Sequence, residues 1–152
     1  MDQELEFQYL CKDAAFIVQT ALIKKHGILV VGKEFNDETI NEVLDLCKND
    51  YIKGLSILGG EPMHPNNIEG TTKLAKAFKE KYPDKSLWAW TGFNFDKDLK
   101  DKEVVNYLDV LVDGTYKDEL HSPTLKWKGS SNQRVIDVKE SLKEKNVVLY
   151  EK

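Results

Sequence analysis

Cysteine is scarce in this 152-residue chain, which has only Cys11 and Cys47. Two cysteines are too few for a disulfide-stapled scaffold, and these two lack the close spacing of metal ligands. The three histidines, His26, His64 and His121, are equally scattered. These absences argue against a zinc site, and we expect both cysteines to be buried, reduced thiols.

Long apolar runs and basic blocks are also lacking. No apolar run approaches the roughly 20 residues that cross a bilayer, and the 22 Lys and Arg residues are spread along a chain of net charge −4. Acidic residues at Asp2, Glu4 and Glu6 stand where a signal peptide would be basic. We therefore expect a cytoplasmic protein with neither a nucleic-acid nor a membrane partner.

What is present, from about Lys33 onward, is an alternation of helix and strand patterns. Asn36 or Asp37 can cap a first helix. The periodicity then predicts strands at 54–58, 86–90 and 108–112, and a last strand at 147–150. It predicts helices at about 36–48, 96–107 and 139–145, and another that contains residues 74–78 and ends before Pro83. Such alternation predicts an α/β fold in one domain, with a parallel sheet and helical crossovers.

Each of the three central strands runs directly into glycine, at Gly59-Gly60, Gly92 and Gly114. Ligands of parallel sheets bind beyond the carboxyl ends of the strands. Glycine there lets the main chain approach a ligand closely and adopt positive φ. Three aligned turns of this kind predict a small-molecule site, although tight turns also need glycine for their own geometry.

Four segments carry a more specific pattern. Residues 58–67 read L-G-G-E-P-M-H-P-N-N, 87–93 read L-W-A-W-T-G-F, 110–116 read V-L-V-D-G-T-Y and 125–134 read L-K-W-K-G-S-S-N-Q-R. In order and spacing they resemble the activating proteins of anaerobic ribonucleoside-triphosphate reductase, a family of radical S-adenosylmethionine (SAM) enzymes. The resemblance covers residues 33 to about 136.

The resemblance implies a fold, an activity and a site. The fold would be a partial (βα) barrel-like parallel sheet of radical-SAM type. The activity would be formation of a glycyl radical on the large subunit of the reductase, with SAM and a [4Fe–4S] cluster as cofactors. The cofactor-binding residues would be Gly59, Gly60, Glu61, Pro62, Thr91, Gly92, Asp113 and Gly114, with the G-G-E-P backbone holding the amino group of SAM.

Each motif residue also has a purely structural interpretation. We expect Trp88 and Trp90 on opposite faces of a buried strand, where packing alone would explain them. Asp113 can cap the turn that Gly114 makes, and Asn132 and Gln133 can satisfy loop backbone.

The cluster motif of the family is missing. By the resemblance, three cysteines spaced C-x3-C-x2-C hold the cluster, and thiolates are the usual ligands of such clusters. Residues 1–32 contain Cys11 alone and do not resemble the family. As written, this polypeptide is predicted to lack the activity.

The abrupt start of the resemblance at Gly32 suggests a frameshift. Read from the third base of each codon, the genetic code permits a sequence close to G-P-G-x-R-V-S-V-F-V-Q-G-C-x-x-x-C-x-x-C-F-N-K-E-T-W-D-F-x-G-G, which resembles the N-terminal strand and cluster loop of the family. Its three cysteines fall at the junctions Asp13/Ala14, Ile17/Val18 and Thr20/Ala21. We hypothesise a one-nucleotide insertion or deletion near codon 32; a real mutation, a sequencing error and an assembly error would look alike.

Two alternatives stay open. Residues 1–32 can be genuine protein, with a helix from about Gln3 to Lys25, a stop at Gly27 and a strand from Ile28 to Val31. The domain would then be single over 1–152, with 1–32 atypical, 33–136 family-like and 137–152 a tail. In function, the chain can be a non-catalytic homologue that binds a reductase partner or a small ligand, or a translated fragment with no function.

Overall fold

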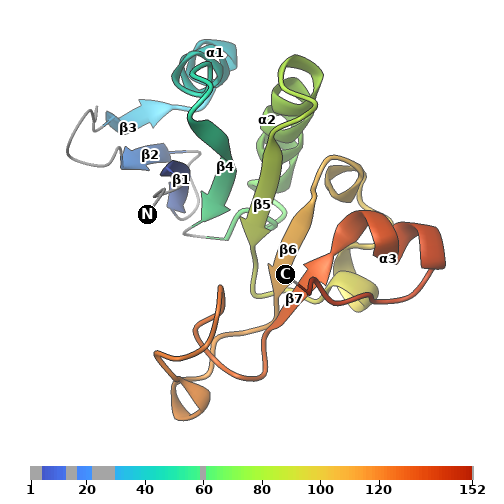
Figure 1. Cartoon of the computed structure of the whole chain (residues 1–152). Coiled ribbons are helices and arrows are strands. Elements are labelled where there is room, and N and C mark those ends of the chain that lie inside the picture. The colour runs from blue at the N-terminus through green and yellow to red at the C-terminus, as the bar shows by residue number, and fades with distance from the viewer. Residues whose placement is uncertain (1–4, 13–16, 22–29, 59–60, 152) are drawn as a thin grey trace.

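The chain folds around one mixed β-sheet flanked by helices (Figure 1). The computed structural model describes residues 5–12, 17–21, 30–58 and 61–151. The strands are β1 (Leu5–Lys12), β2 (Ile17–Ala21), β3 (Val30–Glu34), β4 (Ile52–Leu58), β5 (Ser86–Trp90), β6 (Val110–Asp113) and β7 (Arg134–Asp137). The α-helices are α1 (Asp37–Leu46), α2 (Ile68–Lys81) and α3 (Val138–Glu144), and short helical turns are η1 (Phe95–Leu99), η2 (Glu103–Asn106) and η3 (Asp118–Leu120).

The sheet order is β3-β2-β1-β4-β5-β6-β7. Strands β1, β4, β5 and β6 are parallel neighbours, whereas β2, β3 and β7 pair antiparallel. The predicted α/β class with parallel central strands is confirmed. The barrel-like part of the prediction is not shown, because the described strands form an open sheet with β3 and β7 at its edges.

Helix α1 begins where the sequence predicted. Asn36 and Thr39 form a reciprocal capping box, in which the Asn36 side chain accepts from the Thr39 backbone N–H at 3.1 Å. Such a cap satisfies two of the N–H groups that have no partner within a helix. Helix α2 ends at Lys81, just before Pro83, as predicted from the inability of proline to continue a helix.

The core lies between one face of the sheet and helices α1 and α2. Alternate residues of the central strands, such as Leu55 and Ile57 of β4 and Leu87 and Ala89 of β5, are buried against it. This alternation is the period-two signal of a strand with one face toward a core. Trp88 of β5 is also buried but points to the other face, outside that cluster.

The predictions for the C-terminal third were partly right. The expected helix at 96–107 is two short turns, η1 and η2. Residues 147–150 form no strand, although the Tyr150 N–H donates to the Val135 carbonyl and Ile136 forms an isolated bridge with Leu149. Strand β7 was not predicted, because its antiparallel pairing with β6, distant in sequence, determines it.

The helix expected from Gln3 to Lys25 is wrong over the residues that the structure describes, since β1 and β2 are strands. Within β1, apolar and polar residues alternate along L-E-F-Q-Y, which is the period of a strand. β1 also gains a parallel partner in β4, from Leu5 opposite Ile52 to Leu10 opposite Leu58. The strand expected at Ile28–Val31 is found shifted, at Val30–Glu34, while Gly27 lies outside the described residues.

Over these same described ranges, every helix is too short or too polar to span a lipid bilayer.

Candidate functional site

The carboxyl ends of β4, β5 and β6 lie at one edge of the sheet, because these strands are parallel neighbours. The predicted site residues follow directly: Glu61 and Pro62 after β4, Thr91 and Gly92 after β5, and Gly114 after Asp113 at the end of β6. Gly59 and Gly60, also predicted, lie outside the described residues. Ligands of parallel sheets bind at this edge.

Glu61 joins the loops that follow β4 and β5. One carboxylate oxygen accepts from the Thr91 hydroxyl at 2.6 Å and from the Met63 N–H at 3.0 Å, and the other accepts from the Gly92 N–H at 2.7 Å. A Cβ added at Gly92 would come within 3.3 Å of this carboxylate. Glycine at this position therefore lets the main chain approach Glu61 closely.

The loop after β4 is fixed through its own backbone. The Glu61 carbonyl accepts from the Asn67 side-chain amide at 3.0 Å, and the Pro62 carbonyl accepts from the Thr71 hydroxyl at 2.8 Å. Asn67 is only 3% exposed, and its side-chain oxygen is the one buried side-chain polar atom without a partner in the described part of the chain. Most buried polar atoms in folded proteins have a hydrogen-bond partner, so this acceptor is an exception within the loop.

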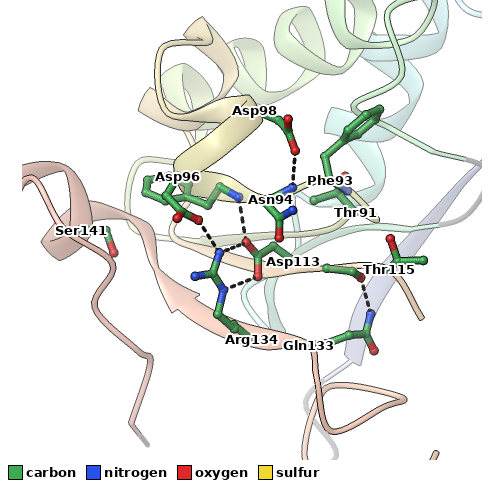
Figure 2. Close-up of polar contacts among 12 residues, drawn as sticks. Thr91, Phe93, Asn94, Asp96, Asp98, Asp113, Thr115, Gln133, Arg134 and Ser141 are labelled. Atoms are coloured by element: carbon green, nitrogen blue, oxygen red, sulfur yellow. Dashed lines mark hydrogen bonds and ion pairs between the residues drawn. The ribbon is translucent and has the colours of Figure 1, made fainter. Parts of the chain in front are cut away.

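Asp113 is the most enclosed charged group at this edge. It is fully buried at the end of β6, where its carboxylate accepts from the Phe95 N–H at 2.7 Å and from two nitrogens of Arg134 at 2.9 and 2.6 Å (Figure 2). Arg134 also donates to Asp96 of η1 at 2.6 Å. The pair with two parallel N–H···O bonds has the geometry that charge-assisted hydrogen bonds favour.

This network shifts the pKa values of Asp96 and Arg134. The hydrogen bond from Arg134 lowers the pKa of Asp96 below its ordinary value, and the carboxylates of Asp113 and Asp96 raise the pKa of Arg134. Arg134 therefore stays charged and ties β7, β6 and η1 together. Sequence reasoning did not select Arg134, although it is the residue that directly follows N-Q in the quoted motif.

Gly114 makes the turn after Asp113 with a φ of +99°, in the region that favours glycine. Its N–H donates to the Phe93 carbonyl at 3.0 Å, and the next residue, Thr115, donates its hydroxyl to the Gly92 carbonyl at 3.2 Å. The ends of β5 and β6 are thus joined by direct hydrogen bonds.

The two tryptophan motifs meet in space. The Trp88 and Trp90 rings stack at 5.7 Å between centroids, so the expectation that they lie on opposite faces is wrong, since residues two apart in a strand share a face. Trp127 packs on Trp88 at 5.2 Å, and its carbonyl accepts from the Trp90 indole N–H at 2.8 Å. Tyr150 closes the cluster at 5.2 Å from Trp88.

Asn132 and Gln133 satisfy loop backbone, as their structural interpretation predicted. The Gln133 side-chain oxygen accepts from the N–H groups of Gly129 and Ser130 at 3.0 and 3.1 Å, while its amide donates to the Gly114 carbonyl at 3.1 Å. The Asn132 amide donates to the Thr115 carbonyl at 2.8 Å.

The residues present do not fit an iron–sulfur cluster. Such a cluster needs three or four thiolates, and the sequence has two cysteines. Cys47 is buried at the end of α1, where burial raises the pKa of its thiol to about 11. Within the described ranges, no group of three His, Cys, Asp or Glu side chains could hold a metal ion.

Of the predicted thiols and imidazoles, Cys47 is confirmed as buried and free, whereas the structure does not describe the side chain of Cys11. His64 accepts from the Asn66 N–H through Nδ1 at 3.1 Å, and His121 Nδ1 lies 3.0 Å from the Gly129 carbonyl. His26 lies outside the described residues.

Comparison with known proteins identifies a matching family and similar proteins. Residues 17–136 match the family of 4Fe-4S single cluster domains. The chain is 40% identical over 104 residues to the anaerobic ribonucleoside-triphosphate reductase-activating protein of Enterobacteria phage T4, which covers 68% of this chain and 65% of the phage protein.

The proteins of the same name from two bacteria are also similar. The chain is 35% identical over 115 residues to that of Pasteurella multocida, which covers 72% of this chain and 73% of that protein. It is 38% identical over 107 residues to that of Escherichia coli strain K12, which covers 68% of this chain and 70% of that protein. No solved structure matches the chain.

Proposed function

Because this chain belongs to the family of anaerobic ribonucleoside-triphosphate reductase-activating proteins, we propose that its gene is that of an activating enzyme for such a reductase. The proposed partner is the large subunit of the reductase, and the proposed reaction is the formation of a glycyl radical on it with SAM and a [4Fe–4S] cluster. The single observation that carries the proposal is the identity of 35–40% to activating proteins.

We place SAM at the carboxyl edge of β4, β5 and β6. The proposed binding residues are Gly59, Gly60, Glu61, Pro62, Thr91, Gly92, Asp113 and Gly114. The direct hydrogen bonds between the loops that follow β4, β5 and β6 support this placement, because they bring the predicted residues together at one edge.

Side chains at this edge act mainly as supports. The carboxylates of Glu61 and Asp113 are already hydrogen-bonded within the protein, so they fix the loops between which a ligand would lie. Backbone groups of these loops remain for direct recognition. Pre-organised loops of this kind lower the entropic cost of binding.

The polypeptide as written is proposed to be inactive. With two cysteines, one of them a buried thiol of raised pKa, it supplies too few thiolates for the cluster. The reading-frame hypothesis puts the three cysteines at junctions 13/14, 17/18 and 20/21. The first of these follows immediately after β1 ends at Lys12. Since β1 is parallel to β4, a cluster loop that followed β1 would lie at the same edge as the proposed SAM site.

The test compares two proteins under anaerobic reconstitution with iron and sulfide. One is the chain as written, and the other has residues 1–32 re-encoded from the shifted frame. We expect about four irons per chain and the charge-transfer absorption of a cluster only in the second. A matched control replaces the three new cysteines by alanine and should take up no cluster. A stoichiometric cluster in the written chain, or none in the re-encoded one, would contradict the proposal.

A non-catalytic homologue is the second candidate. It is favoured by the internal hydrogen bonds of Glu61 and Asp113, which hold the edge together without a ligand. Calorimetric titration of the written chain with SAM separates the two: binding with ordinary affinity in the absence of a cluster would favour a ligand-binding homologue over a damaged enzyme.

A further inference from the structure

The connection between β6 and β7 is a projecting arm, residues 115–133. Figure 1 shows it extending away from the sheet, beyond the carboxyl end of β6. Residues 115–121 are all exposed, including the short turn η3. An arm without a core of its own would be expected to be mobile unless other contacts fix it.

Two sets of contacts do fix the arm. At the base of the arm, the Gln133 side chain joins the outgoing and returning chain segments. It accepts from the Gly129 N–H and donates to the Gly114 carbonyl. Further out, Trp127 packs on Trp88 and adopts a φ of 64°, which is rare for an aromatic residue. Rare backbone conformations persist where the surroundings determine them and often occur at functional sites.

The exposed segment 115–121 of the arm presents two large hydrophobic side chains to solvent. Tyr116 is 50% exposed and Leu120 is 38% exposed, and these are two of the four exposed large hydrophobic residues in the part of the chain that the structure describes. Tyr116 is held in place: its hydroxyl donates to Asp118 at 3.1 Å, and a Cβ added at Gly129 would meet its ring at 3.0 Å. A pre-oriented aromatic side chain is the kind of group that contributes strongly to protein interfaces.

We propose that the arm is the docking element for the large subunit of the anaerobic reductase, with Tyr116 and Leu120 as its contact residues. This inference rests on the proposed function. The proposed target is a glycine within a second protein, so that protein must cover the carboxyl edge of the sheet. The arm begins at this edge, where the Thr115 hydroxyl bonds to the Gly92 carbonyl. A polypeptide that reaches the site therefore lies beside the arm.

The chain offers matched controls for a binding experiment. Tyr51 is 57% exposed and precedes β4, at the opposite, amino edge of the sheet, and Leu149 is 52% exposed outside the arm. Neither residue belongs to the arm. If only the arm variants bind the reductase more weakly, the cause is the loss of the arm contacts. If the Tyr51 and Leu149 variants also bind more weakly, the cause is the loss of exposed apolar surface in general.

The experiment measures equilibrium binding of the 152-residue chain to the purified large subunit of the reductase. We expect Tyr116→Ala and Leu120→Ala each to weaken binding by about fivefold or more, the effect of a contact residue at an interface. Tyr51→Ala and Leu149→Ala should leave the affinity unchanged. Tyr116→Phe, which keeps the ring against Gly129, should bind nearly as well as the unaltered chain. Gln133→Ala should weaken binding although it leaves both contact side chains in place.

Three results would overturn the docking proposal: no binding by the unaltered chain, equal losses for the arm and control variants, or arm variants that alter self-association in ultracentrifugation but not reductase binding. Circular dichroism of each variant shows that it is folded. Cluster uptake by the re-encoded chain is measured without the reductase, so its failure would count against the proposed function alone, and failure of docking with normal cluster uptake would count against the arm alone.

Discussion

The described residues of 35–151, the first region, and strands β1 to β3, the second region, lie in one sheet but differ in how firmly their sequences specify it. In the first region, buried side chains, a helix capping box and a buried ion pair all agree with the same structure. In the second, β1 joins the sheet through parallel pairing with β4, and β2 and β3 follow at the edge. The four quoted motifs lie in the first region, whereas the match to the family model, residues 17–136, begins within the second.

The difference shows that more amino-acid sequences can form a β-strand at a given position than can form a cofactor site. Backbone hydrogen bonds do not depend on the side chain, so many alternating sequences can pair with β4. A cluster loop needs cysteine at three exact positions. A shifted reading frame can therefore leave a compatible strand while it destroys the chemistry.

The largest effect on stability is expected in the first region, from Arg134→Met. This change removes the partner of Asp113, which is fully buried and would be left with an uncompensated charge. We expect the free energy of unfolding to fall by about 3–5 kcal/mol, measured by urea denaturation. Lys143→Met, which breaks an exposed pair with Glu140, should change it by less than about 1 kcal/mol. Similar losses for the two variants would mean that the network does not tie β6, β7 and η1 together.

The next effect compares the two regions directly. Leu111→Ala in β6 truncates a fully buried side chain and should lower the free energy of unfolding by about 2–5 kcal/mol. In β1 the comparison uses the backbone, which pairs with β4: under the reading-frame hypothesis we expect its amides to exchange with deuterium faster than those of β6, because segments that were not selected together open more readily. Equal protection of β1 and β6 would indicate that residues 1–32 are an evolved part of this fold.

The smallest effect is a pH dependence within the first region. Burial by itself raises the pKa of Asp109, but hydrogen bonds from Lys139 and Lys79 outweigh it and hold the pKa below its ordinary value. The unfolded state then binds the proton more readily, so this stabilisation is present above about pH 4 and is lost as the pH falls further.

Asp109→Asn tests this dependence. The free energy of unfolding should fall by about 1–3 kcal/mol at pH 7, with a smaller difference from the unaltered chain near pH 3. A difference that stays constant between these pH values would show that the charge of Asp109 does not contribute.

Much of the first region could be predicted from sequence. Strand β5 was predicted with its exact bounds, and α1 with its capping residue, because apolar periodicity and caps act locally. The meeting of Glu61, Thr91 and Gly92 followed from the rule that parallel strands present their carboxyl ends at one edge. The family resemblance predicted a membership that the comparisons confirm.

Other features depend on contacts between distant residues and left no local signal. Arg134 lies in a polar stretch, and only the fold shows that it pairs with Asp113, 21 residues before it in sequence. Strand β7 was missed for the same reason, since its pairing partner β6 determines it. In β1 and β2 an alternation was present beside the helical pattern, and strand pairing, of β1 with β4 and of β2 with β1, decided between them.

The central claim is that residues 1–32 are translated out of frame, and the DNA sequence across codons 1–35 tests it most directly. The account predicts that the codons at junctions 13/14, 17/18 and 20/21 have third bases that give cysteine in the shifted frame, and that one nucleotide has been gained or lost near codon 32. A codon that forbids cysteine at any one of these three junctions would contradict it.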